Sequence, residues 1–125
     1  MLRNVRFRRM EVESEWGRRI RKRYVVFTIL SDKNLSKRDV ESVITRVFKD
    51  FYGSDLLVKA DPQLVYYEPR LMRGVIRVNG LYKDQLISVL GFIRDVNGVK
   101  CLFIPVKTTG TIRKARRIME RLEKD

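Results

Sequence analysis

The chain contains no histidine and a single cysteine, Cys101, among its 125 residues. Histidine is the commonest general base near neutral pH, so its absence removes the usual acid–base groups and the usual catalytic triads. One cysteine cannot form an intramolecular disulfide, and without histidine it cannot build a zinc site. Because Cys101 lies in an apolar run, we expect a buried structural thiol in a reducing compartment, with a reactive thiol as the alternative.

Long apolar segments and phosphate-binding loops are also missing. No apolar run approaches the roughly 18 residues that a membrane-spanning helix needs, and the first residues lack the apolar core of a signal peptide. No glycine-rich loop precedes a helix in the pattern that holds nucleotide phosphates. The carboxylates are scattered, with no spacing typical of a two-metal nuclease. We therefore expect a cytoplasmic protein that has no membrane partner and itself binds no cofactor or metal.

Positive charge is what the chain has in excess. It has 28 Lys and Arg against 15 Asp and Glu, a net charge of +13, and the two ends carry most of it. Residues 1–23 hold nine basic and three acidic groups, and residues 107–125 hold seven and three. Arginine outnumbers lysine by 18 to 10, and its planar guanidinium matches phosphate oxygens and stacks on bases. The ends are therefore expected to bind nucleic acid.

A thermophile-type surface and a membrane-binding helix are the alternatives to nucleic-acid binding. A solvated, thermophile-type surface would pair its cations with many glutamates, but only 7 residues are Glu. A membrane-surface helix would need a long apolar face, which neither end shows.

The composition divides the chain into a basic N-terminal arm over residues 1–20 and a single domain over residues 21–125. A chain of this length supports one hydrophobic core, and its 44% content of hydrophobic residues favours a packed domain. Strand patterns occupy residues 24–30, 56–67, 71–78 and 99–106, the second of them broken at Asp61 and Pro62. Amphipathic patterns predict helices over residues 36–52 and 81–94, and over a last segment that Thr111 caps. Gly53 is placed to end the first helix.

The order of these segments predicts an α+β fold. It reads β-α-β-β-α-β, the ferredoxin-like split βαβ sandwich, with an extra basic C-terminal helix. In this plan the first and third strands lie in the middle of the sheet, and two helices cover one face.

The third strand distinguishes between kinds of RNA-binding domain. Alternation places Arg73, Val75 and Arg77 on the face opposite the apolar one. An RNA-recognition motif would carry base-stacking aromatic residues here, and this strand has none. The two arginines therefore face phosphates, a partner protein or only solvent.

The loop before the last helix is a second candidate site. Thr109, Gly110 and Thr111 open that helix, where free backbone N–H groups attract phosphate. Arg113 and Lys114 follow in its first turn, where cations interact unfavourably with the helix dipole. A nearby phosphate would offset this unfavourable interaction. Ordinary capping by Thr111 with solvated cations is the alternative. The candidate RNA-binding residues are Arg6, Arg8, Arg9, Arg18, Arg19, Arg21, Lys22, Arg23, Lys107, Thr109, Gly110, Thr111, Arg113, Lys114, Arg116 and Arg117.

Three segments carry a family resemblance. They are residues 21–27 opening the first strand, residues 74–78 on the third, and residues 109–114 after the fourth. At these spacings they resemble the protein component 2 family of archaeal ribonuclease P, over most of the chain from about Arg21 to Arg117. The lead-in departs from the family, because it contains Trp16 and no proline where the family's is often proline-rich.

The resemblance implies a subunit of ribonuclease P, the ribonucleoprotein endonuclease and hydrolase that removes the 5′ leader during tRNA processing. In that family the RNA subunit performs the chemistry with Mg²⁺, so no catalytic residue is expected in the protein. The implied partners are ribonuclease P RNA, precursor tRNA, other ribonuclease P proteins, and component 3 in a heterotetramer with two copies of each. Arg73, Val75 and Arg77 would then form a partner-binding surface. A different basic module, such as a ribosomal-type protein or nucleic-acid adaptor, and a ferredoxin-like enzyme remain alternatives.

Overall fold

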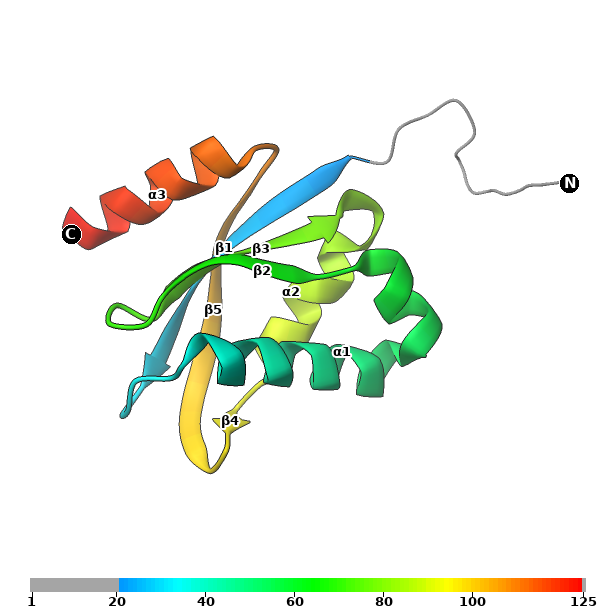
Figure 1. The fold of residues 1–125 in the computed structure, drawn as a ribbon, viewed down its shortest axis with the longest axis horizontal. Helices are drawn as coiled ribbons and strands as arrows, with labels where there is room; N and C mark the ends of the chain where they lie inside the picture. Colours follow the sequence, from blue (N-terminus) through cyan, green and yellow to red (C-terminus); the bar gives the residue numbers. More distant parts are fainter. Residues whose placement is uncertain (1–20, 125) are drawn as a thin grey trace, which may run out of the picture.

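The computed structural model of the protein describes residues 21–124 (Figure 1). The predicted basic arm over residues 1–20, with Arg6, Arg8, Arg9, Arg18 and Arg19, lies outside the described residues. The elements are β1 (Lys22–Ser31), α1 (Lys37–Ala60), β2 (Gln63–Glu68), β3 (Arg73–Asn79), the short 3₁₀ helix η1 (Gly80–Tyr82), α2 (Lys83–Phe92), β4 (Asp95–Val96), β5 (Val99–Thr109) and α3 (Ile112–Lys124).

The five strands form one antiparallel sheet in the order β2-β3-β1-β5-β4, with β1 and β3 in its interior. Helices α1 and α2 cover one face of the sheet, and α3 lies across the other (Figure 1). The predicted ferredoxin-like α+β fold with an extra C-terminal helix is therefore confirmed. No helix among residues 21–124 is both long enough and apolar enough to cross a membrane.

The main core lies between the sheet and helices α1 and α2. Phe27 of β1 stacks on Phe103 of β5, with ring centroids 5.7 Å apart and planes inclined by 12°. Phe48 of α1 and Leu86 of α2 are fully buried in the same cluster. This cluster takes the odd-numbered residues of β1, as the alternation of a half-buried strand requires.

A smaller core joins α3 to the opposite face. Ala115 and Met119 of α3 are buried against Val26 of β1 and Val75 of β3. On this face, the middle of β1 and β3 is therefore covered and not open to solvent. The sequence predicts that Val75 shares a face with Arg73 and Arg77, which is right. Its assignment of Val75 to a partner-binding surface is wrong, because α3 buries this side chain completely.

Helix α1 runs further than the sequence predicts. Gly53 leaves the helical conformation, with φ 88° and ψ 167°, but the chain resumes the helix and continues to Ala60. Residues 56–58, predicted as part of a strand, are therefore helical. The reason is packing, because Leu56 and Leu57 contact the main core and Ala60 is buried within it. Asp61 ends the helix in the left-handed conformation, and its N–H donates to the Leu57 carbonyl.

The last hairpin adds a strand that the sequence does not predict. Two residues, β4, pair with the start of β5 across a turn in which Asn97 and Gly98 have φ values of 52° and 83°. Strand β5 is 11 residues long and extends to Thr109. A register shift opposite Val26 and Phe27 leaves Val106 as an extra, exposed residue of β5.

Candidate nucleic-acid interface

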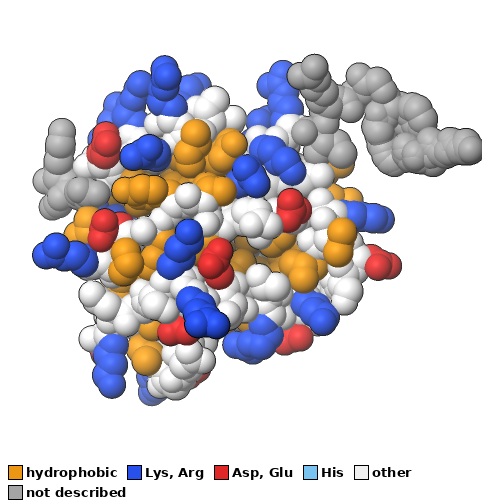
Figure 2. Space-filling view, viewed as in Figure 1, with side chains coloured by type: hydrophobic (Ala, Val, Ile, Leu, Met, Phe, Trp, Pro, Cys, Tyr) orange, Lys and Arg blue, Asp and Glu red, His pale blue; other side chains and the backbone are white. Residues whose placement is uncertain are grey.

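Two basic segments that are distant in the sequence, residues 21–23 and 107–117, meet at one end of the sheet. Tyr24 of β1 pairs with Thr109 of β5, so the start of β1 lies beside the end of β5 and the start of α3. Lys22 pairs with Asn79, which brings the start of η1 to the same end. Lys and Arg side chains gather over α3 and the beginning of β1 (Figure 2). We call this region the cationic end and define it by Arg21, Lys22, Arg23, Lys107, Gly110, Arg113, Lys114, Arg116 and Arg117.

Gly80 allows two backbone segments of the cationic end to approach closely, and Gly110 lies beside an arginine side chain of this end. The Gly80 N–H donates to the Arg21 carbonyl over 2.8 Å, and a Cβ at Gly80 would lie 2.7 Å from that oxygen and 3.2 Å from Cγ of Arg23. A Cβ at Gly110 would lie 3.5 Å from Nη1 of Arg23. The guanidinium of Arg23 is therefore beside the loop that opens α3, as a shared phosphate site would require.

The hydroxyl groups of the loop have structural roles. Oγ1 of Thr111 accepts from the Lys114 N–H over 3.2 Å, which is the helix cap that the sequence predicts. The buried hydroxyl of Thr109 donates to the Thr111 carbonyl over 2.8 Å. Because both hydroxyl groups serve the loop itself, an anion at this end would be bound mainly by cationic side chains.

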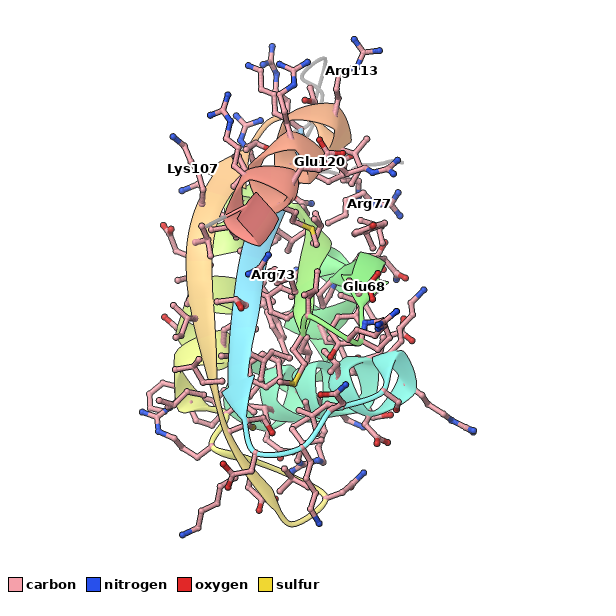
Figure 3. All side chains as sticks on the ribbon, turned by 90° about the vertical axis from the view of Figure 1, so that its left-hand side faces the viewer. Glu68, Arg73, Arg77, Lys107, Arg113 and Glu120 are labelled. Atoms are coloured by element: carbon pink, nitrogen blue, oxygen red, sulfur yellow. The ribbon has the colours of Figure 1, made fainter. Side chains whose placement is uncertain are left out.

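The cationic side chains of α3 and its loop are exposed. Lys107, Arg113, Lys114 and Arg117 are all open to solvent, and Figure 3 shows Lys107 and Arg113 projecting from the end of the molecule where α3 begins. The guanidinium carbon of Arg116 lies 5.1 Å from the ring centroid of Tyr66 on β2. This cation–π contact favours a position of the Arg116 side chain beside β2.

The arginines of β3 lie on either side of Val75, which α3 covers. Arg77 pairs with Tyr24 and so lies at the same end of the sheet as the cationic end, whereas Arg73 pairs with Thr28 and lies apart from it. Both are partly buried, and Nη1 of Arg73 and Nε of Arg77 have no hydrogen-bond partner among residues 21–124. A buried guanidinium N–H without an acceptor costs free energy, so both positions favour an additional acceptor.

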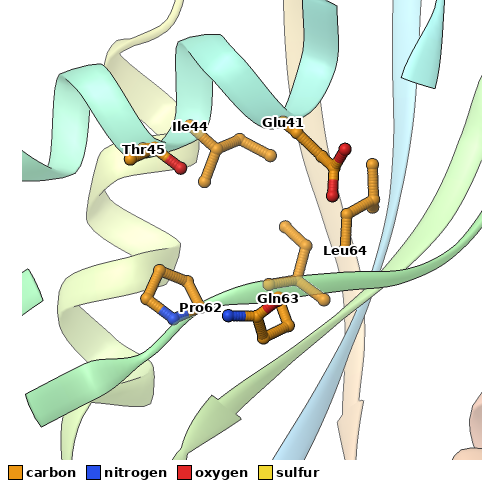
Figure 4. Close-up of a pocket in the computed structure, with 7 residues that line it drawn as sticks. Glu41, Ile44, Thr45, Pro62, Gln63 and Leu64 are labelled. Atoms are coloured by element: carbon orange, nitrogen blue, oxygen red, sulfur yellow. The ribbon is translucent and has the colours of Figure 1, made fainter. Parts of the chain in front are cut away.

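Other parts of the structure show no constellation typical of catalysis among residues 21–124. A pocket of about 120 Å³ between α1 and β2 contains one carboxylate, Glu41, among Ile44, Pro62 and Leu64 (Figure 4). No group of three metal-binding side chains occurs in the described part of the chain. Cys101 is buried, and burial together with nearby Asp95 raises the pKa of its thiol against the opposing effect of Arg94. The prediction of a buried structural cysteine is confirmed.

The fold and this surface define a ferredoxin-like α+β domain that concentrates cations at one end of its sheet. The chain belongs to the Rpp14/Pop5 family of ribonuclease P protein subunits, whose model matches residues 23–119. It is similar to ribonuclease P protein component 2 of Aeropyrum pernix, with 36% identity over 103 residues that cover 81% of this chain and 84% of the relative. The same component of Saccharolobus islandicus is 32% identical over 98 residues, or 78% and 68% of the two chains.

A solved structure agrees on the fold. A chain in the cryo-EM structure of yeast ribonuclease MRP superposes with a TM-score of 0.62, covering 88% of this chain and 97% of that one. At 14% identity this likeness concerns the fold alone. The resemblance to the component 2 family that the sequence indicates is therefore confirmed through the family and its curated relatives.

Proposed function

We propose that this protein binds ribonuclease P RNA through its cationic end and so assists the RNA in removing the 5′ leader of precursor tRNA. The observation that carries the proposal is the meeting of β1, β5 and α3 at one end of the sheet. Their cations lie far apart in the sequence, yet the register of β1 with β5 and the Gly80 contact hold them together. Clustered, exposed Lys and Arg are the electrostatic feature that phosphate backbones bind.

In this proposal the protein supplies no reacting group. Chain residues neutralise phosphates and fix the shape of the RNA, and Mg²⁺ held by the RNA supplies the hydrolytic chemistry. Neutralising phosphates lowers the repulsion between RNA segments that must come close together, which is a general effect of basic subunits. The place of action is the cytoplasm.

The proposal includes a protein partner. The chain pairs with ribonuclease P component 3, in a heterotetramer with two copies of each, and joins the other protein subunits on the RNA. Arg73 and Arg77 support a protein contact, because their unsatisfied N–H groups lie on the face away from α1 and α2.

Replacing Arg113 and Lys114 by alanine tests the cationic end. Both side chains are exposed, so the fold should stay intact while two phosphate contacts are lost. If six to eight cations meet phosphates, the slope of log K against log [salt] is roughly −5 to −7, and the double variant should reduce its magnitude by about 1.4 to 1.8. The measurement is RNA affinity between about 50 and 200 mM salt, together with cleavage by the reconstituted enzyme.

The chain offers a matched control beyond the opposite end of β1. Lys37 and Arg38 are also consecutive, exposed cations in the first turn of a helix. Their replacement by alanine removes the same charge and should leave the salt slope unchanged. Equal effects of the two double variants would show that the RNA responds only to net charge and would reject the cationic end as a site.

A further inference from the structure

The face of the sheet that carries α3 is only partly covered by it. Beyond the helix, toward the end of β1, three aliphatic side chains are left in solvent. Leu30 of β1 is 57% exposed, and Leu102 and Ile104 of β5 are 42% and 38% exposed. We call these three residues the aliphatic strip.

Strand pairing places the strip on one continuous surface. Leu30 pairs with Leu102, and Thr28 pairs with Ile104 on one side and with Arg73 on the other. Cross-strand partners share a face, so the strip and Arg73 are neighbours on the sheet. Val26, the next residue of β1 on this face, is fully buried by α3. The strip therefore continues the apolar surface on which α3 already packs.

The surroundings of the strip are charged and include an unsatisfied donor. Arg73 borders it with a buried Nη1 that lacks a hydrogen-bond partner among the described residues. Lys100 lies two residues before Leu102 and hence on the same face. A shallow depression adjoins the far end of the strip and is lined by Leu30, Asp32, Arg94, Asp95, Lys100 and Leu102. An apolar centre with a charged border is the usual anatomy of a protein interface.

We infer that the aliphatic strip is a docking face for a protein partner that presents apolar side chains to it and a carboxylate to Arg73. This inference rests on the proposed function, since it assigns the protein-binding surface of the same subunit. The strip has no donors for phosphate and no aromatic ring for base stacking, so RNA gains little by covering it. A carboxylate against the accessible part of the partly buried Arg73 side chain would add a charge-assisted hydrogen bond.

Leu102→Glu is the variant that tests the inference. Its side chain is exposed, so a glutamate should be accepted by the fold but would place a charge at the centre of the contact. The control is Val58→Glu, which makes a comparable substitution at a residue of α1 that is 76% exposed. The probe is purified ribonuclease P component 3, and thermal unfolding of each variant verifies the fold. If Leu102→Glu unfolds, Ile104→Ser makes a milder change to the same strip.

The expected result is a loss of affinity for component 3 of at least tenfold for Leu102→Glu, with Val58→Glu and RNA affinity unchanged. Arg73→Gln should also weaken the protein contact, and Arg73→Lys should weaken it less. Unchanged binding of component 3 by Leu102→Glu and Ile104→Ser would overturn the inference. Variants that lose only RNA affinity would also overturn it and would assign the strip to RNA. Variants that lose only self-association of the chain would overturn it and would assign the strip to a second copy.

The two proposals fail in different ways. A wild-type chain that does not stimulate cleavage of precursor tRNA overturns the proposed function, and the inference that rests on it. A wild-type chain that stimulates cleavage while the strip variants bind component 3 normally overturns the strip alone.

Discussion

Gly80 links the start of β1 to the start of η1 through a close backbone contact. Any other residue type at this position would displace the start of β1. The Arg21 carbonyl lies 2.7 Å from the position of a Cβ at Gly80, and real Cβ atoms do not come so close to oxygen. Because backbone atoms cannot rotate away as a side chain would, the strand end itself has to move. The backbone arrangement at the cationic end therefore requires a residue without a Cβ at position 80.

Gly80→Ala should therefore lower the free energy of unfolding by about 1–3 kcal/mol, the usual cost of overpacking. It should also weaken RNA binding, since Arg21 and Arg23 are displaced. Gly91→Ala is the control, because a Cβ there has nothing within 4 Å and its helical position favours alanine over glycine. Urea unfolding of both variants checks the prediction, and a Gly80→Ala protein as stable as Gly91→Ala would contradict it.

Tyr67 gives a pH-dependent prediction. Burial raises the pKa of its phenol from 10.0 to about 12, and its hydroxyl donates to the Leu35 carbonyl over 2.8 Å. Between these two pH values the unfolded chain loses the proton and the folded chain keeps it. The contribution of Tyr67 to stability is therefore complete below the unfolded pKa of 10.0 and is lost as the pH rises toward 12.

Tyr67→Phe should cost about 0.5–1.5 kcal/mol at neutral pH, the net value of one hydrogen bond. The difference in unfolding free energy between the wild type and this variant should shrink as the pH rises from 10.0 to about 12. Comparing the two proteins removes the contribution of the many lysines, which titrate in the same range. A difference that stays constant over this range would show that the phenol titrates normally in the folded protein.

Single residues also mark the limits of what the sequence predicts. Thr111 is correctly identified as a cap, because its type and position define a local interaction. Val75 is correctly assigned to a face, since alternation along a strand is local as well. That the face is covered at Val75 depends on where α3 packs, and the sequence contains no local signal for this.

Among the elements, α3 rests on a small set of tertiary contacts. Ala115 and Met119 are its buried residues, and many of its other side chains are cations exposed to solvent. An isolated helix of this length is marginal in water, so packing against Val26 and Val75 holds it in place. The helix that carries Arg113 and Lys114 is thus fixed by a small apolar contact.

Met119→Ala should lower the free energy of unfolding by about 2–5 kcal/mol if α3 unfolds together with the domain. If α3 opens separately, its amide protons should exchange faster while those of β1 and β3 stay protected. Arg121→Ala, an exposed change on the same helix, is the control and should leave stability nearly unchanged. Hydrogen exchange and urea unfolding together distinguish the two outcomes, and an unaltered Met119→Ala protein would contradict the described packing of α3.

The elements show where sequence patterns succeed and fail. The three interior strands, β1, β3 and β5, and the three main helices are predicted, because their apolar patterns are strong. Gly53 correctly marks a break in α1 but not its end, since a single glycine with a positive φ lets the helix resume when the following residues pack well. Strand β4 is not predicted, because two residues are too few to show an alternation of apolar and polar side chains. The Asn97–Gly98 turn beside it is predicted.

At the scale of the whole molecule, the sheet brings together basic residues that are distant in the sequence. Basic residues at both ends of the chain are identified from composition alone, but the proximity of residues 21–23 to residues 107–117 follows from the antiparallel register of β1 with β5. The described members of the predicted site, from Arg21 to Arg117, come together at the cationic end. Arg77 lies at the same end of the sheet, because it pairs with Tyr24, whereas Arg73 pairs with Thr28 and borders the aliphatic strip that α3 leaves uncovered.

Reconstituted cleavage is the decisive measurement for the role of this chain. Ribonuclease P RNA, component 3 and precursor tRNA are combined at moderate Mg²⁺, with and without this protein, and release of the 5′ leader is measured. We expect that release depends on this chain, that the chain alone cleaves nothing, and that the Arg113→Ala, Lys114→Ala variant is impaired while the Lys37→Ala, Arg38→Ala variant is not. Leader release that is indifferent to the chain, although the chain binds the RNA tightly, would contradict the proposed function.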